Sequence, residues 1–355
     1  MKAIIRLFTG FMAAFLIGGC ATPGITGAAS HRLLNRYQKS FLDAFDTVTI
    51  VTLYEMDEAE AEAQLTQAHE KLLYYHKLFD IYHTYDGMNN LCSVNKNAGV
   101  APVRVDAALI ELLIDAKQMG AFTGGRMKIA MGSVLSIWHD AREAGISDPE
   151  RAAIPPMEQL REAARHIDIE RLIIDEQAGT VYLADDRMRL DVGAIAKGYA
   201  AQKTADWMVE ECGVTSMLLN IGGNVCAVGS RGDGTPWKVA VQSPENPQET
   251  LCTLAIDGMS LVTSGTYQRY YTVDGVRYHH IIDPKTLLPS TYFESVTVLS
   301  KDSVLGDALS TALFNMPLDE GVALVESMPD VEALWVDAAG KRTLSCGFEA
   351  YLAPD

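Results

Sequence analysis

Clustered basic charge is missing from this sequence of 355 residues. Lys and Arg total 29 against 46 Asp and Glu, and the formal net charge is −17. Binding to a phosphate backbone depends on groups of Lys and Arg, so the sequence argues against nucleic acid as a partner. The acidity by itself indicates no other partner.

Cysteine is scarce, and no two of the six cysteines form a C-x-x-C pair. They are Cys20, Cys92, Cys212, Cys226, Cys252 and Cys346. This irregular spacing argues against a zinc site and against a disulfide framework. We expect most of them to be buried small hydrophobic residues.

The apolar stretch near the start, Leu7 to Ile17, is too short to span a bilayer as a mature helix. It follows Lys2 and Arg6. A positive start before a short apolar run is typical of a signal peptide, which we predict over residues 1–19.

The end of that peptide, "LIGGC", is similar to the lipobox of bacterial lipoproteins, in which the peptide is cut before the cysteine and the cysteine is lipidated. The resemblance implies lipidation of Cys20 and a tether over residues 20–40. Residues 41–355 would then form a globular body anchored to the bacterial cell membrane and facing outside the cytoplasm. The alternative is an ordinary secretory signal in which Cys20 occurs by chance.

Strand and helix patterns alternate along the rest of the chain, without a clear repeat or a long linker. Residues 46–56, "DTVTIVTLYEM", have the β-branched character of a strand, and residues 58–82 carry apolar positions at helical spacing. Those positions are Leu65, Ala68, Leu72, Tyr75 and Phe79. Asp106 is placed to cap a second helix, which the glycines at 124–125 would end.

The second half continues this alternation. A break at Pro155 and Pro156 precedes a short helix. Residues 171–192 then predict two strands around a turn at 177–179 and a third strand at 187–190. The pair at 274–275, Asp-Gly, favours a hairpin turn.

The stretch "LDVGAIAKGYA", residues 190–200, places an aspartate, two glycines and a lysine before and inside a helix that we expect to start near Ile195. The first turn of a helix has unpaired N–H groups that suit a phosphate, and Lys197 could add a positive charge to the same anion. The alternative is a packed turn in which the glycines permit close approach and Lys197 is solvated.

Asp307 and Thr311 stand four residues apart in "SVLGDALSTALFNM", and therefore on one face of the predicted helix. A carboxylate and a hydroxyl suit a hard cation such as magnesium, which prefers oxygen ligands. The alternative is that Asp307 caps the helix and Thr311 fills the core, bonded to its own helix. We expect Asp307 to be a surface carboxylate that contributes little to packing.

The hairpin near residue 275 follows Tyr267, Arg269 and Tyr271, and its outgoing strand carries His279 and His280. Neighbouring strand residues point to opposite faces, so one histidine can enter a cleft while the other does not.

Seven stretches of this chain, in the same order, resemble those of the ApbE family, the FAD:protein FMN transferases. They are "FDTVTIVTLY", "GGRMKIAMGSVLSIWHDARE", "LDVGAIAKGYA", "LLNIGGN", "SGTYQRY", "YHHIIDP" and "DALSTAL". Each is a weak signal alone, but their common order after the tether makes coincidence implausible. Many members of the family are lipoproteins, in agreement with the lipobox.

The resemblance implies a T-fold-like α+β body, with mixed or antiparallel sheets flanked by helices and a smaller associated α/β subdomain. Family members move the FMN half of FAD onto a threonine or serine hydroxyl of an acceptor flavoprotein, with magnesium bound and AMP released. The implied ligands of Mg²⁺ are Asp307, Thr311 and the main-chain carbonyl of Ala194. The implied FAD contacts are Tyr82, Asp191, Lys197 and Ile281. His280 matches the catalytic histidine, and His279 is expected to be structural.

Three positions depart from the family pattern. Leu287 stands where a glycine is usual, so we expect that turn to differ. Gln268 replaces the more usual glutamate and removes a charge. Phe45 and Asp46 precede Thr47 where Met-Gly-Thr is usual. The flavin packing that the family has near this first strand therefore cannot be assigned to the present chain.

Other functions could use the same pocket. A non-catalytic FAD-binding lipoprotein could dispense with metal and base, and the retention of Asp307, Thr311 and His280 favours an enzyme. Hydrolysis of FAD to FMN and AMP is a related activity. A solute-binding lipoprotein is not supported, because no two similar lobes are evident.

Overall fold

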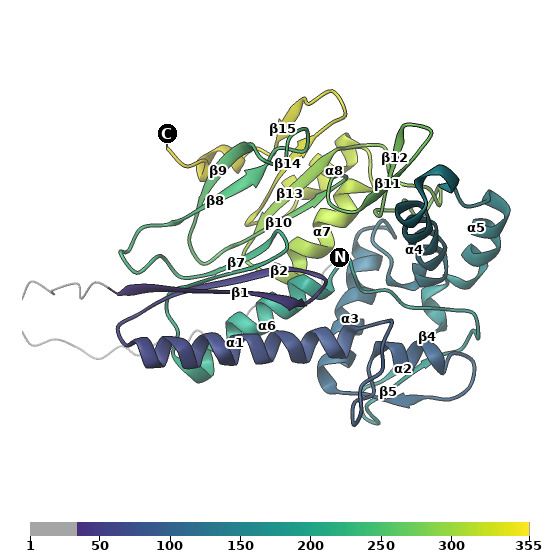
Figure 1. Ribbon diagram of the computed structural model, residues 1–355, viewed down its shortest axis with the longest axis horizontal. Helices are drawn as coiled ribbons and strands as arrows, with labels where there is room; N and C mark the ends of the chain where they lie inside the picture. Colours follow the sequence, from purple (N-terminus) through teal and green to yellow (C-terminus); the bar gives the residue numbers. More distant parts are fainter. Residues whose placement is uncertain (1–33, 355) are drawn as a thin grey trace, which may run out of the picture. The chain divides into compact units, whose positions relative to one another are not determined.

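An eight-stranded antiparallel sheet forms the centre of the structure (Figure 1). The computed structural model describes residues 34–354, which belong to one compact unit. In the sheet the strands follow the order β1-β2-β6-β7-β10-β13-β14-β15. They are β1 (Asn35–Ala44), β2 (Thr47–Glu55), β6 (Met217–Ile221), β7 (Asn224–Val228), β10 (Ser260–Gly265), β13 (Ser295–Ser300), β14 (Val331–Val336) and β15 (Arg342–Leu344).

Helices cover one face of this sheet. They are α1 (Glu58–Phe79), α6 (Ala196–Cys212), α7 (Ser303–Phe314) and α8 (Leu318–Glu326). The side chain of Asp57 caps α1 by accepting a hydrogen bond from Glu60 N at 3.0 Å. All five apolar positions predicted for α1 are buried. Their 3.6-residue spacing therefore marks the face of α1 that packs on the core.

The other face of the sheet is covered by the hairpin of β8 (Trp237–Gln242) and β9 (Thr250–Ile256), with η6 (Phe348–Tyr351) beside it. Trp237 and Phe348 pack there against Leu261 and Leu299 of the sheet. Every residue of β13 is buried, because this strand has a helix on one side and the hairpin on the other.

The remaining elements form two groups within the same compact unit, and the first contains a smaller sheet. This three-stranded sheet has the order β3-β5-β4. The strands are β3 (Val103–Arg104), β4 (Leu172–Asp175) and β5 (Thr180–Leu183), and the helices beside them are α2 (Leu91–Lys96), α3 (Ala107–Phe122) and η5 (Ile169–Arg171). A further group consists of η2 (Ile129–Met131), α4 (Gly132–Ser147), η3 (Pro149–Arg151), α5 (Met157–Ala163), η4 (Ala164–His166) and the hairpin β11 (Tyr270–Val273) to β12 (Val276–His279). The architecture confirms the expected α+β body with antiparallel sheets flanked by helices.

Most of the predicted elements are present. Asp106 caps α3 by accepting from Ala108 N at 2.9 Å, and the hairpin turns at Asp274 and Gly275, with φ of 49° and 81°. The strand predicted at 187–190 is wrong. There the N–H and C=O of Leu190 bond to the side chain of Asn95, at 2.8 and 2.9 Å, instead of a neighbouring strand.

Two expectations about the ends and the cysteines need correction. Strand β1 begins at Asn35, so ordered structure starts before residue 41. Cys92 and Cys226 are buried, whereas Cys212 and Cys252 are partly exposed and Cys346 is exposed. All five are free thiols.

The predicted signal peptide and the cysteine proposed for lipidation lie outside the described residues. Between residues 34 and 354, no helix is long and apolar enough to cross a membrane.

Candidate active site

One cleft of about 1270 Å³ opens where α4, α6, α7 and the β11–β12 hairpin meet the end of the central sheet. All eight residues predicted for the metal, FAD and catalysis line it, from four separate parts of the chain: Tyr82, Asp191, Ala194, Lys197, His280, Ile281, Asp307 and Thr311. Sites for small molecules usually span about 300–1,000 Å³, so this cleft is large enough for a dinucleotide.

Most N–H groups at the N-terminus of α6 already have hydrogen-bond acceptors within the protein. Val192 O accepts from the N–H groups of Ile195 and Ala196 at 3.0 and 2.8 Å. The N–H of Gly198 donates to Asp307 Oδ2 at 2.8 Å. The predicted phosphate site made of free helix N–H groups is therefore wrong for these three groups. Of the two anion-binding features predicted for this stretch, the side chain of Lys197 is the one that the structure leaves at the cleft.

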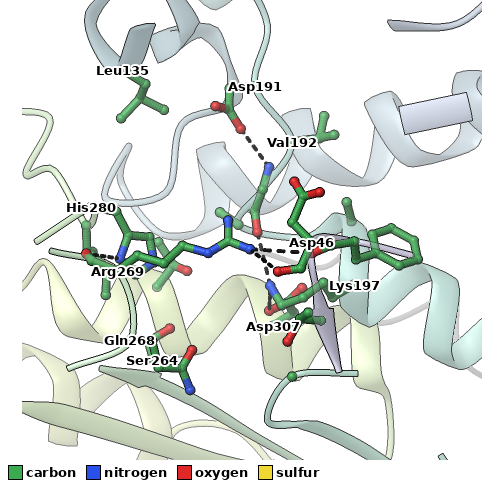
Figure 2. Close-up of a pocket in the computed structure, with 18 of the residues that line it drawn as sticks. Asp46, Leu135, Asp191, Val192, Lys197, Ser264, Gln268, Arg269, His280 and Asp307 are labelled. Carbon is green, nitrogen blue, oxygen red and sulfur yellow. Dashed lines mark hydrogen bonds and ion pairs between the residues drawn. The ribbon is translucent and has the colours of Figure 1, made fainter. Parts of the chain in front are cut away.

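Asp191 holds the turn before this helix. Its Oδ1 accepts from Gly193 N at 2.8 Å, and its own N–H donates to Ile129 O at 2.8 Å (Figure 2). Burial in the cleft raises the pKa of the Asp191 carboxyl above its usual value, and the bond from Gly193 N opposes this rise.

Gly198 permits the close approach of α6 to α7. A Cβ added at Gly198 would lie 2.2 Å from Ser303 O and 2.6 Å from Asp307 Cβ. No such contact occurs between unstrained atoms, so the packing explanation offered for the glycines holds at this position.

Gly198→Ala is expected to lower the free energy of unfolding by about 1–3 kcal/mol or more, because the two helices must separate to admit the methyl group. Gly321→Ala in α8 is the matched control, since its Cβ would meet other atoms at 3.4 Å or beyond. There the better helix propensity of alanine should leave stability unchanged or raised by up to about 1 kcal/mol. Urea unfolding midpoints of both variants check this, and equal losses would contradict the packing role of Gly198.

Asp307 lies inside the protein and does not cap its helix. Asp302 is the N-cap of α7, accepting from Val304 N at 2.7 Å and from Leu305 N at 3.2 Å. Asp307 is only 3% exposed, so the expected surface carboxylate is also wrong. Its Oδ1 lies 3.5 Å from Lys197 Nζ. The Asp307 carboxylate thus connects α7 to the start of α6 through Gly198 N, and it forms an ion pair with Lys197 at the cleft.

Two of the three implied metal ligands, Ala194 O and the Thr311 hydroxyl, have no hydrogen bond in the described chain, whereas Asp307 is bonded to Gly198 N and paired with Lys197. Since Gly198 N donates to Asp307, no N–H bonds to the carbonyl of Ala194. The hydroxyl of Thr311 bonds to no carbonyl of its own helix, contrary to the alternative of a core filler. No group of three or more His, Cys, Asp or Glu suited to a metal exists within residues 34–354. A carboxylate, a hydroxyl and a carbonyl fit magnesium, which prefers oxygen.

His280 follows β12 and faces the cleft. Its backbone N–H and its Nδ1 both point to Arg269 O, at 3.1 and 3.3 Å. Nδ1 therefore carries the proton, and Nε2 is left as the basic nitrogen. His280 is exposed to solvent on the cleft side, but partial removal of water by the cleft walls is the largest cause that lowers its pKa below the ordinary value of 6.5, and the charge of Arg269 is the next. The imidazole is accordingly neutral at pH 7 and able to accept a proton.

His279 points the other way, into the protein. Its Nε2 donates to Ser290 O at 2.8 Å, and its Nδ1 accepts from Ile281 N at 3.2 Å. These two bonds agree with the structural role expected for His279, and they fix the backbone that presents Ile281 to the cleft.

His139 and Arg142 are cleft residues that the sequence analysis did not single out. Arg142 Nη2 donates to His139 Nδ1 at 2.9 Å. Tyr82 lies beside them, with its hydroxyl 3.4 Å from the same nitrogen and its ring centre 5.2 Å from the imidazole. The signal available was their spacing of three residues in "WHDARE", which places both on one face of α4.

Leu287, one of the three departures from the family pattern, lies in a turn beside α4. Leu287 has φ of 62°, a left-handed conformation that glycine adopts more easily than leucine. Such a conformation costs a non-glycine residue about 1–3 kcal/mol. Its side chain is buried, and its carbonyl accepts from Trp138 Nε1 at 2.9 Å. Burial and this bond offset the strain.

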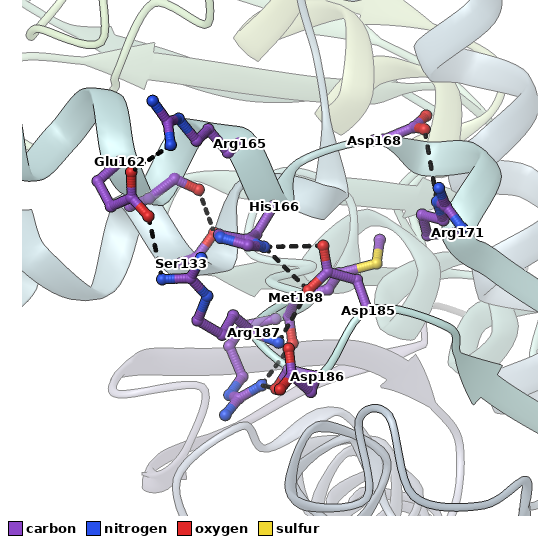
Figure 3. A network of polar contacts seen from close by, with 12 residues as sticks. Ser133, Glu162, Arg165, His166, Asp168, Arg171, Asp185, Asp186, Arg187 and Met188 are labelled. Atoms are coloured by element: carbon purple, nitrogen blue, oxygen red, sulfur yellow. Dashed lines mark hydrogen bonds and ion pairs between the residues drawn. The ribbon is translucent and has the colours of Figure 1, made fainter.

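A second hollow, of about 1160 Å³, lies beside α5 and η4. Figure 3 shows that its basic side chains are mostly paired. Glu162 binds Arg165 and Arg187 at 3.0 and 3.1 Å, and Asp185 binds His166 at 2.7 Å. Because carboxylates already occupy these cations, the hollow is a weaker anion site than the cleft.

Known proteins are similar to this chain over most of its length. The model of the ApbE family matches residues 45–335. The FAD:protein FMN transferase of Klebsiella pneumoniae is 33% identical over 81% of this chain and 85% of its own length. That of Treponema pallidum is 35% identical over 69% of this chain and 70% of its own length.

Solved structures show the same fold. The ApbE protein of Thermotoga maritima superposes with a TM-score of 0.77 at 26% identity, over 90% of this chain and all of that one. The flavin transferase ApbE of Vibrio cholerae gives 0.75 at 24% identity, with the same coverage.

Proposed function

The chain belongs to the ApbE family, and we propose that it is an FAD:protein FMN transferase. It moves the FMN moiety of FAD to a threonine or serine hydroxyl of an acceptor flavoprotein and releases AMP, with Mg²⁺ bound. One observation carries this proposal: one cleft large enough for a dinucleotide brings together the His280 imidazole, the Lys197 ammonium and the oxygen atoms of Asp307, Thr311 and Ala194. A protein that only stored FAD would need neither the base nor the metal ligands.

The residues divide the work of a phosphoryl transfer, in which positioning and charge stabilisation supply most of the catalysis. Tyr82 and Ile281 border the space for the flavin, and Asp191 holds the turn that presents Lys197. His280 Nε2 takes the proton of the acceptor hydroxyl as its oxygen bonds to the phosphorus of FMN. Asp307, Thr311 and Ala194 O would hold Mg²⁺, which neutralises charge on the phosphate oxygens when bound.

The activity is tested by incubating the protein with FAD, Mg²⁺ and a candidate acceptor domain, followed by mass measurement of the acceptor. We expect a gain equal to one FMN less one water, together with one AMP for each acceptor modified. AMP and free FMN without any acceptor modification would identify the related hydrolysis instead. Binding of FAD without either product would identify a storage protein.

We also propose that the chain is a lipoprotein, anchored through Cys20 to the bacterial cell membrane and facing outside the cytoplasm. The sequence "LIGGC" supports this. Cys20→Ala should convert a membrane-associated protein into a soluble or unprocessed one, as fractionation and immunoblotting would show. Cys346→Ala, which removes an exposed thiol elsewhere, is the control and should stay with the membrane. Wild-type protein found free in the medium would contradict the anchor.

A further inference from the structure

Arg269 brings a guanidinium into the cleft and leaves most of its donors unused (Figure 2). Nη2 contacts the carbonyl oxygens of Phe45 and Asp46, at 3.4 and 3.2 Å. Within residues 34–354, no carboxylate is paired with Arg269, although the chain as a whole is strongly acidic. A guanidinium has five N–H donors in a planar fork, so several remain available to a ligand.

The turn between β1 and β2 fixes this side chain. Phe45 and Asp46 both have left-handed backbones, with φ of 58° and 51°, and this turn directs their carbonyls to Arg269. The N–H of Phe45 is held by His76 Nδ1 at 3.1 Å. These are the residues that replace Met-Gly at this edge of the family pattern.

The positive charge of Arg269 acts on three groups of the cleft. It lowers the pKa of His280, opposes the rise in the pKa of Asp191, and opposes the rise in that of Tyr82. The guanidinium consequently lies among the proposed base and two of the proposed FAD contacts.

Two other donors of positive charge in the cleft already have partners. The N–H groups of Ala196 and Gly198 in α6 bond to Val192 O and Asp307 Oδ2. Lys197 is paired with Asp307 and also donates to Gly193 O at 3.3 Å. The N–H groups of α6 and Lys197 would neutralise only part of the negative charge of a pyrophosphate bound in the cleft. A planar arginine fork is well matched to two phosphate oxygens.

We propose that Arg269 binds the pyrophosphate of FAD and stabilises the phosphate of AMP as it leaves, while its main-chain carbonyl orients His280. This inference rests on the proposed transferase function. In the transfer, the acceptor oxygen forms a bond to the FMN phosphorus and its proton goes to His280 Nε2. The bond from that phosphorus to the bridging oxygen breaks, and AMP departs with the electron pair. Arg269 donates to the oxygens on which this charge accumulates.

Arg269→Gln, Arg269→Lys and the wild type would be titrated with ADP and with riboflavin, which shares the flavin ring but has no phosphate. In Arg269→Gln we expect ADP and FAD to bind about tenfold to a hundredfold more weakly, as for the loss of charge-assisted hydrogen bonds, and transfer to slow about a hundredfold. Riboflavin affinity should stay within about twofold of the wild type. Lysine keeps the charge without the fork, so Arg269→Lys should be intermediate.

Arg277→Gln is the matched control, because Arg277 is an exposed arginine on the same hairpin and does not line the cleft. It should bind all ligands like the wild type. Unchanged ADP affinity in Arg269→Gln would overturn the inference and leave the transferase intact. Equal losses for ADP and riboflavin would also overturn it, since they would show a purely structural role. Weakened ADP binding in a protein that modifies no acceptor would support the phosphate contact and contradict the transferase.

Discussion

Asp307→Ala is expected to slow FMN transfer about a thousandfold, because a bound metal ion contributes several kcal/mol of charge stabilisation in the transition state. The same change should lower the free energy of unfolding by about 1–3 kcal/mol, since the buried N–H of Gly198 loses its acceptor. The measurements are transfer rate against Mg²⁺ concentration and urea unfolding.

Two variants separate the chemical from the structural part of this effect. Asp307→Asn keeps an oxygen for Gly198 N, so it should retain most of the stability while transfer is still lost. Asp302→Ala removes the N-cap of the same helix, outside the cleft, and should cost about 1 kcal/mol of stability while transfer is kept. An Asp307→Asn protein with normal transfer and normal magnesium dependence would remove this residue from the metal site.

His280→Ala is the second change with a large expected effect, a loss of about 10²–10⁴-fold in transfer, the range for removal of a general base. FAD affinity should change little, because the imidazole acts on the incoming hydroxyl. His280→Asn should be equally slow, although its amide can still donate to Arg269 O. His83→Asn makes the same replacement at an exposed histidine outside the cleft and should leave the rate unchanged.

The pH dependence has a defined sign. Because the pKa of His280 is lowered, the basic form persists below pH 6.5, and transfer should fall only as the pH drops through the lowered value. The unfolded chain binds the proton more readily, so this group makes folding less favourable as the pH falls below its ordinary pKa. In Arg269→Gln the neighbouring charge is gone, and the acidic limb of the rate profile should move to higher pH. A limb at 6.5 in the wild type would show that the cleft does not lower the pKa.

The amino-acid sequence by itself predicted most of the local elements and eight residues that line one cleft. Helix α1 follows from a 3.6-residue apolar spacing, and the turn at Asp274 and Gly275 follows from two residues that tolerate positive φ. Both are short-range properties, readable from neighbouring residues. The order of seven motifs indicated the family and, through it, eight residues that line one cleft.

Only the tertiary structure decided how those residues act on one another. Asp307 was expected on a helix surface, but Gly198 lets α6 approach α7 until the carboxylate is buried against its N–H. Leu287 has a left-handed backbone, and burial of its side chain offsets the strain. Arg269 meets the turn at Phe45 and Asp46, more than 200 positions earlier in the chain. Helix-to-helix approach, burial and such long-range contacts depend on packing between distant segments, which local sequence patterns do not specify.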